Sequence, residues 1–99
     1  MIITYLGKQF FKISQGDTVI AYNPISKDSK HKDMASKFGA NIALISVNHK
    51  DYNGADTVTH GNTVPFVISG PGEYEVGGIS ILGSGVETEI DNKMHINTV

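Results

Sequence analysis

The sequence predicts a β-rich domain of the α+β class, with a mostly antiparallel sheet and one short helix. Short runs of β-prone residues alternate with turns along most of the 99 residues. Many of the 11 glycines lie between those runs. A single stretch, residues 33–38, has the spacing of an amphipathic helix. Strand, turn and strand at short spacing is typical of hairpins, so we expect a single domain, residues 1–99, built largely of them.

The N-terminal part predicts three strands, at residues 2–6, 10–14 and 18–22. Gly7 ends the first strand, and Gln15-Gly16-Asp17 forms a tight turn between the second and the third. Glycine and aspartate favour such turns because glycine adopts positive φ and aspartate bonds to nearby backbone. We therefore expect an antiparallel meander here.

A short helix and a buried strand are expected next. Met34, Ala35 and Phe38 would share one helical face, with Asp28 or Ser29 as the cap and Gly39 at the C-terminal end. Residues 42–47 are nearly all apolar, which favours a strand buried on both faces.

The second half predicts further short strands and two more hairpins. Gly77-Gly78 is the expected turn of one hairpin and Asp91-Asn92-Lys93 that of the other. The strand candidates are residues 57–59, 65–69, 73–76, 79–82, 86–90 and 94–99.

Composition excludes several classes of site. The chain has no cysteine, so disulfides, thiolate zinc sites and cysteine nucleophiles are ruled out. Met1 to Tyr5 lacks the basic and apolar regions of a signal peptide, and no apolar run approaches the ~20 residues that span a bilayer. We expect a cytoplasmic protein without membrane contact.

Charge is unevenly distributed along the chain. Residues 1–50 carry seven lysines and three aspartates, whereas residues 51–99 carry one lysine and seven acids. None of the basic residues is arginine, which best forms bidentate contacts to phosphate or guanine, so we do not expect nucleic acid as a partner. Lys27, Lys30 and Lys32 lie in one polar loop and are candidates for binding an acidic partner. A solvated surface is the simpler interpretation of these lysines.

The candidate metal-binding or catalytic residues follow the buried strand. His49 and Asp51 lie on a loop after residues 42–47, where rigid strand ends position ligands or catalytic groups. A neutral imidazole and a carboxylate together suit zinc, iron or manganese. Two such residues are a weak signal, because Asp51 in a surface loop is equally expected to bond backbone amides.

Around this loop the sequence resembles the metallo-β-lactamase superfamily. The motif of that family, T-H-x-H-x-D-H followed by glycine, is matched by Ser46, His49, Asp51 and Gly54. Three other segments follow the family order: Ile3-Thr4-Tyr5-Leu6-Gly7, with Lys8 where the family has His; Val19-Ile20-Ala21-Tyr22-Asn23-Pro24, with Asn23 in place of Asp; and Pro71-Gly72-Glu73-Tyr74-Glu75-Val76. The resemblance implies the N-terminal half of an αββα sandwich.

Two motif histidines are replaced in this chain. Val47 stands at the first histidine position and has no donor atom, and Tyr52 stands at the last. One ligand then remains for each of the two metals that the family binds, whereas a catalytic zinc needs about three protein ligands. Three spare histidines, His31, His60 and His95, have no spacing that brings them to His49. We therefore expect no bound cofactor, or zinc only if a partner completes the site.

Two functional hypotheses follow. The chain is a degenerate half-domain of a zinc-dependent hydrolase fold and is not catalytic alone, or it is a protein-binding or assembly module that reuses the scaffold. Both imply association with a second half-domain or, more simply, a two-fold homodimer. One short helix would cover a single face of the sheet, and an apolar second face would then need a partner.

Overall fold

The main element of the structure is a five-stranded sheet. The computed structural model describes residues 1–31, 38–90 and 93–98. Three strands form the predicted antiparallel meander, with bounds within one residue of those expected: β1 (Ile2–Gly7), β2 (Phe10–Gln15) and β3 (Thr18–Tyr22). Gly16 has a φ of 57° in the two-residue connection between β2 and β3, as that turn requires.

The other half of this sheet is parallel. β4 (Ile42–Leu44) pairs with β3, and β5 (Phe66–Ile68) pairs with β4, both in parallel. The strand order is therefore β1-β2-β3-β4-β5, with β1 and β5 at the edges. The predicted run 42–47 is buried as expected, but its ladder ends at Leu44. Ile45 still donates its N–H to Ile68 O at 2.8 Å, while Ser46 donates to a side chain.

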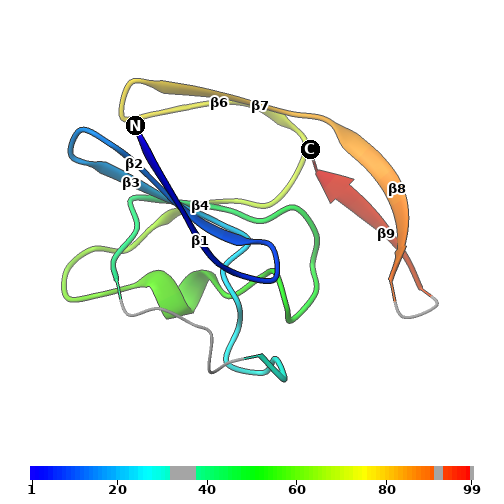
Figure 1. Ribbon diagram of the computed structural model, residues 1–99. Helices are drawn as coiled ribbons and strands as arrows, with labels where there is room; N and C mark the ends of the chain where they lie inside the picture. The colour runs from blue at the N-terminus through cyan, green and yellow to red at the C-terminus, as the bar shows by residue number, and fades with distance from the viewer. Residues whose placement is uncertain (32–37, 91–92, 99) are drawn as a thin grey trace.

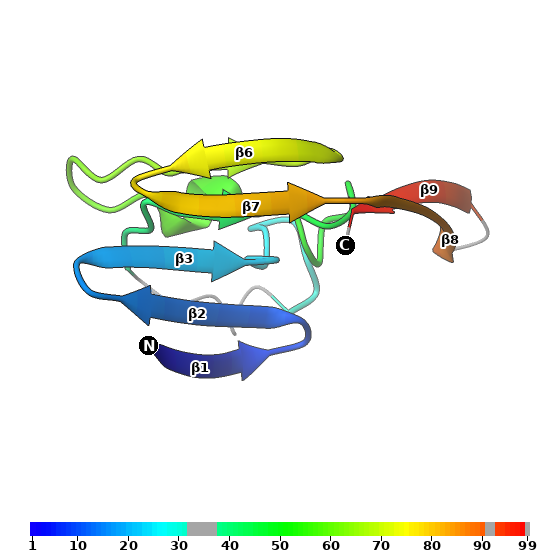
Figure 2. The same ribbon diagram turned by 90° about the horizontal axis from the view of Figure 1, so that it is seen from above.

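Two hairpins lie outside this sheet, so the prediction of one continuous sheet is wrong. β6 (Gly72–Val76) pairs with β7 (Ile79–Gly83), and β8 (Gly85–Ile90) pairs with β9 (Lys93–Thr98), both antiparallel. The sequence predicted the bounds of the strands in both hairpins to within one residue. Figures 1 and 2 show that β8 and β9 extend away from the main sheet.

Loops and a short helix cover the lower face of the sheet. The 3-10 helix η2 (Ala55–Val58) lies beneath it in Figure 1. Small alanines on the strands let these segments approach closely, and the buried cluster on this face comprises Phe10, Ala21, Ile25, Ala40, Ala43 and Val58. The strand predicted at 57–59 is therefore wrong. Thr57 instead bonds through Oγ1 to Gly54 O at 2.7 Å, which favours the helical turn over its β-branched preference.

The β6–β7 hairpin covers part of the upper face. Tyr74, Val76, Ile79 and Ile81 pack against a second cluster made by Ile20, Ile42 and Ile68. The second face is thus not left bare, contrary to the argument that one helix could cover only one face. In the view of Figure 2, however, β6 and β7 leave β1 and β2 uncovered on that side.

The predicted helix at 33–38 falls outside the described residues except for Phe38. Phe38 is partly buried, and its ring stacks on that of Phe10 with centroids 6.0 Å apart. The described part of the chain is accordingly β-rich, with a single 3-10 helix. No helix among the residues described is long and apolar enough to cross a membrane.

Candidate functional site

The loop that follows β4 brings His49 and Asp51 together, as the sequence predicted. The His49 N–H bonds to Val47 O, and Tyr52 N–H bonds to His49 O at 2.8 Å, so the loop forms a tight turn. Within this turn His49 Nδ1 accepts the Asp51 backbone N–H at 3.1 Å and lies 3.8 Å from Asp51 Oδ2. The histidine thereby fixes the orientation of the aspartate.

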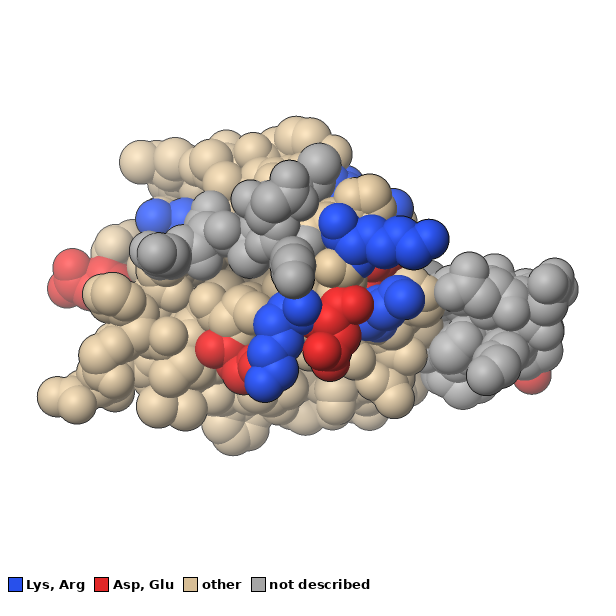
Figure 3. Space-filling model, turned by 90° about the horizontal axis from the view of Figure 1, so that it is seen from below, with Lys and Arg blue, Asp and Glu red and all other residues tan. Residues whose placement is uncertain are grey.

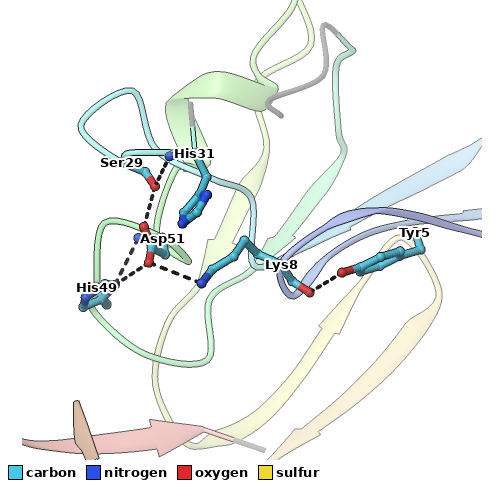
Figure 4. A network of polar contacts seen from close by, with 6 residues as sticks. All are labelled: Tyr5, Lys8, Ser29, His31, His49 and Asp51. Carbon is cyan, nitrogen blue, oxygen red and sulfur yellow. Dashed lines mark hydrogen bonds and ion pairs between the residues drawn. The ribbon is translucent and has the colours of Figure 1, made fainter. Parts of the chain in front are cut away.

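Asp51 is the centre of a polar network drawn from three segments of the chain (Figure 4). Ser29, which is buried in the loop after β3, donates its hydroxyl to Asp51 Oδ1. Lys8, in the turn between β1 and β2, places Nζ 3.9 Å from Asp51 Oδ2. The Asp51 side chain is only 15% exposed and that of Lys8 33%. The carboxylate therefore has a donor on one oxygen and a cation near the other.

These neighbours decide the ionisation of Asp51. Partial burial by itself raises the pKa of this carboxyl group. The hydrogen bond from Ser29 and the electrostatic influence of His49, Lys8 and His31 outweigh that effect and hold the pKa of Asp51 below its ordinary value. Asp51 is therefore a carboxylate at neutral pH.

The position of Lys8 depends on an uncommon backbone conformation. Lys8 has a φ of 52°, which is rare for a residue with a side chain. Its carbonyl oxygen accepts the Tyr5 hydroxyl at 2.9 Å, which stabilises the turn. The turn aims the lysine side chain at the Asp51 loop (Figure 4).

A close backbone contact clamps the Asp51 loop to the loop after β3. Gly54 N–H donates to Pro24 O at 2.7 Å, and Ser26 N–H donates to Lys50 O at 3.0 Å. A Cβ on Gly54 would lie 2.4 Å from Ile25 O, so a side chain does not fit there. The glycine that matched the motif thus has a structural reason in this chain.

Asn23 holds the end of β4 from the other side. This residue is fully buried with a φ of 50°, and asparagine tolerates that conformation better than most residues. Its Oδ1 accepts the Ser46 N–H at 2.8 Å, and its own N–H donates to Leu44 O at 2.8 Å. Asn23 is a structural clamp behind the loop and lies on no exposed surface.

The other residues considered in the sequence lie at different distances from Asp51. Val47 is buried, Tyr52 packs its ring 5.4 Å from that of His49, and His60 is exposed in a turn with Thr63. His31 is near enough to influence Asp51, which its spacing in the sequence did not indicate. His95 lies on β9, and the described residues contain no group of three His, Asp or Glu side chains suited to a metal ion.

The structure describes two of the three lysines that the sequence proposes as a binding loop. Lys27 and Lys30 are exposed, and Lys32 falls outside the described residues. Figure 3, which views the molecule from below, shows lysines next to acidic side chains on this face. Mixed charge of this kind is typical of a solvated surface.

Sequence reasoning missed Lys8, Ser29 and the contribution of His31. Lys8 was noted only as a replacement of histidine in a family motif, and Ser29 only as a helix cap. Both lie more than 20 residues from Asp51 in the sequence, and no local pattern reports a contact over such a separation. The position of Lys8 in that motif was the one available signal.

The main sheet is mixed and has a His/Asp loop after its inner parallel strand β4, and the comparisons identify the family of this scaffold. A family model described as a beta-lactamase superfamily domain matches residues 2–97, so the chain belongs to that superfamily. A solved structure, a putative Zn-dependent hydrolase of the metallo-β-lactamase superfamily from Thermotoga maritima, has 25% identity and a TM-score of 0.62. The match covers 97% of this chain and 40% of that one. No curated protein matches.

The described residues around His49 and Asp51 do not fit a zinc ion. His49 Nδ1 already accepts a backbone N–H, and the Asp51 carboxylate is bonded to Ser29 and faces an ammonium group. Val47 and Tyr52 add no imidazole at the other motif positions. A cation placed beside Asp51 would also have to displace or repel Lys8. The site is arranged as an ion pair between Lys8 and Asp51, with a hydrogen bond from Ser29 to the carboxylate, and not as a set of convergent ligands.

Proposed function

We propose that this chain is a degenerate half-domain of the metallo-β-lactamase fold that has no hydrolase activity alone. Its role is to provide the first sheet of a larger assembly. The observation that carries the proposal is the ion pair between Lys8 and Asp51. Where the family resemblance implies a metal, the carboxylate has a lysine side chain as its counter-charge.

The lysine supplies a positive charge beside Asp51 but cannot act as a Lewis acid as a metal ion does. An ammonium group neutralises Asp51 and joins the β1–β2 turn to the loop after β4. It has no open coordination position and does not lower the pKa of a bound water, which is what a catalytic zinc does. The loops are therefore held in the family arrangement while metal-activated hydrolysis is lost.

Zinc enters this proposal only through a partner. One chain offers His49 and Asp51, and further ligands would have to come from a second half-domain. Such a site would also require Lys8 to move away from Asp51. The match covers 40% of the similar chain, so that chain contains residues with no counterpart in this sequence.

Metal content and charge compensation test the proposal together. We expect the purified chain to hold no zinc by native mass spectrometry, and Lys8→Met to create weak zinc binding because Asp51 loses its counter-charge. Zinc should then raise the melting temperature of Lys8→Met and leave the wild type unchanged.

Two variants control this experiment. Lys50→Met removes an exposed lysine from the loop that carries Asp51 and should gain no zinc response. Lys8→Met/Asp51→Asn removes both charges and should lose the response of the single variant. Near-stoichiometric zinc in the wild type, abolished by His49→Ala, would overturn the proposal.

The second candidate function is a non-catalytic assembly module, and the edge of the main sheet favours it. β1 exposes Ile2, Ile3 and Tyr5, which is unusual for an edge strand of a stable monomer. The lysine loop favours it less, because acidic side chains adjoin lysines on that face. Hydrolase assays against ester and phosphoester substrates should show no turnover that depends on Asp51.

A further inference from the structure

The outer edge of β1 lacks the features that normally protect an edge strand. Natural edges carry lysine, proline or strong bulges that prevent pairing with another chain. Residues 1–7 contain no charged side chain and no proline, and the bulge lies only at the end, between Tyr5 and Gly7. Alternate residues of such a strand direct unpaired N–H and C=O groups outward.

The opposite edge of the same sheet is protected. β5 has only three residues, and prolines lie close to both of its ends, Pro65 directly before it and Pro71 three residues after it. Proline has no N–H to donate, and short strands offer few bonds. The two edges therefore differ in their capacity to pair, although both carry exposed apolar residues.

Two apolar rows run across the sheet and end on β1. One row passes through five residues paired in register: Ile3, Ile13, Ile20, Ile42 and Phe66. The other passes through Tyr5, Phe11, Tyr22, Leu44 and Ile68. The β6–β7 hairpin covers the middle of these rows, and Ile42 is fully buried. At the β1 end of the two rows the side chains are exposed to solvent, Ile3 by 62% and Tyr5 by 61%.

We infer that β1 pairs with β1 of a second copy of this chain, antiparallel about a two-fold axis, to form a continuous ten-stranded sheet. With Thr4 on the axis, Ile3 lies opposite Tyr5 of the second copy and Ile2 lies opposite Leu6. Aromatic and β-branched side chains form favourable cross-strand pairs. Both apolar rows then continue from one copy into the next.

The partner is a second copy because the edge is complementary to itself. An uncharged strand offers no charge by which to select a different protein. Antiparallel pairing about a two-fold uses the same donors and acceptors on both sides and leaves no open end, which is the commonest form of assembly. The inference deepens the assembly role proposed above and replaces the face-to-face dimer expected from the sequence.

Charge placed on the edge tests the interface. We expect a dimer at about 100 μM by light scattering after size exclusion, since modest interfaces associate in the micromolar range. Ile3→Lys should give a monomer, because a charged side chain would replace the apolar partner of Tyr5 and the two lysines would be diagonal neighbours of like charge across the axis. Val64→Lys, at an apolar residue 70% exposed outside any strand, should remain a dimer. Circular dichroism verifies that each variant is folded.

A cysteine placed on the axis locates the contact. The chain has no cysteine, so Thr4→Cys introduces a single thiol. Residues opposite each other in an antiparallel pair have Cα atoms ~4.5–5.5 Å apart, within reach of a disulfide. Oxidation should link Thr4→Cys into a covalent dimer and leave the exposed control Thr59→Cys mostly unlinked. A monomeric wild type, or a dimer that Ile3→Lys leaves intact, would overturn the inference, whereas the zinc measurements would be unaffected.

Discussion

The two halves of the main sheet differ in how far their side chains are covered by the rest of the chain. In the parallel half, the core of β3 and β4 is covered on both faces, by loops and η2 below and by the β6–β7 hairpin above, and only the edge strand β5 exposes apolar side chains, Phe66 and Val67. The antiparallel half, β1 and β2, has exposed apolar side chains at its edge. The covered half positions the Asp51 loop, and the open half is available for assembly. The difference shows that one sheet can hold a site rigidly and still offer a surface.

Truncating the same apolar row at two points should give the largest contrast. Ile42→Ala removes a fully buried side chain and should lower the free energy of unfolding by about 2–5 kcal/mol. Ile3→Ala removes a mostly exposed one and should cost under about 1 kcal/mol in the monomer. Urea unfolding at low protein concentration measures both. Equal losses would mean that β1 is buried by the chain itself.

The clamp below the covered half should be the next most sensitive. Gly54→Ala places a Cβ against Ile25 O and should destabilise the chain by about 1–3 kcal/mol through forced backbone movement. Gly61→Ala is a control that meets no atom within 4 Å, although its positive φ carries a smaller penalty. Thermal unfolding compares the two. A Gly54 variant as stable as wild type would show that the two loops move apart freely.

Loss of the Asn23 amide should have an effect of about the same size. Asn23→Ala leaves the Ser46 N–H buried without an acceptor, which costs about 1–3 kcal/mol. Asn23→Asp retains an acceptor for Ser46 but loses the donor to Gln9 and buries a carboxylate, so it should also destabilise the chain near neutral pH. Hydrogen exchange at Ser46 reports the bond directly.

The smallest expected effect is the pH dependence of the stability that Asp51 contributes. Because the pKa of Asp51 is lower in the folded chain, the group adds stability above its ordinary pKa, and this stability is lost as the pH falls through the folded value. Asp51→Asn lacks that contribution. The difference in unfolding free energy between wild type and Asp51→Asn, under about 1 kcal/mol for so partly exposed a pair, should shrink from pH 5 to pH ~2. A constant difference would contradict the assignment.

Local patterns predicted the meander and both later hairpins, because turns and alternating strands are encoded within a few residues. They also predicted that His49 and Asp51 lie on one loop. They did not predict the parallel pairing of β3, β4 and β5, nor the contacts of Lys8 and Ser29 with Asp51, which depend on segments distant in sequence. The strand expected at 57–59 was wrong because hydrogen bonds from Thr57 outweighed β-branching.

The topology of the main sheet also has a consequence for the order of folding. Neighbouring strands β1, β2 and β3 close through turns of a few residues, whereas β3 reaches β4 across residues 23–41 and β4 reaches β5 across residues 45–65. Closing longer loops costs more conformational entropy and slows folding. We expect the meander to form first and to serve as the template on which β4, and then the Asp51 loop, are added. The strand that remains open in the finished sheet would therefore be among the earliest to form.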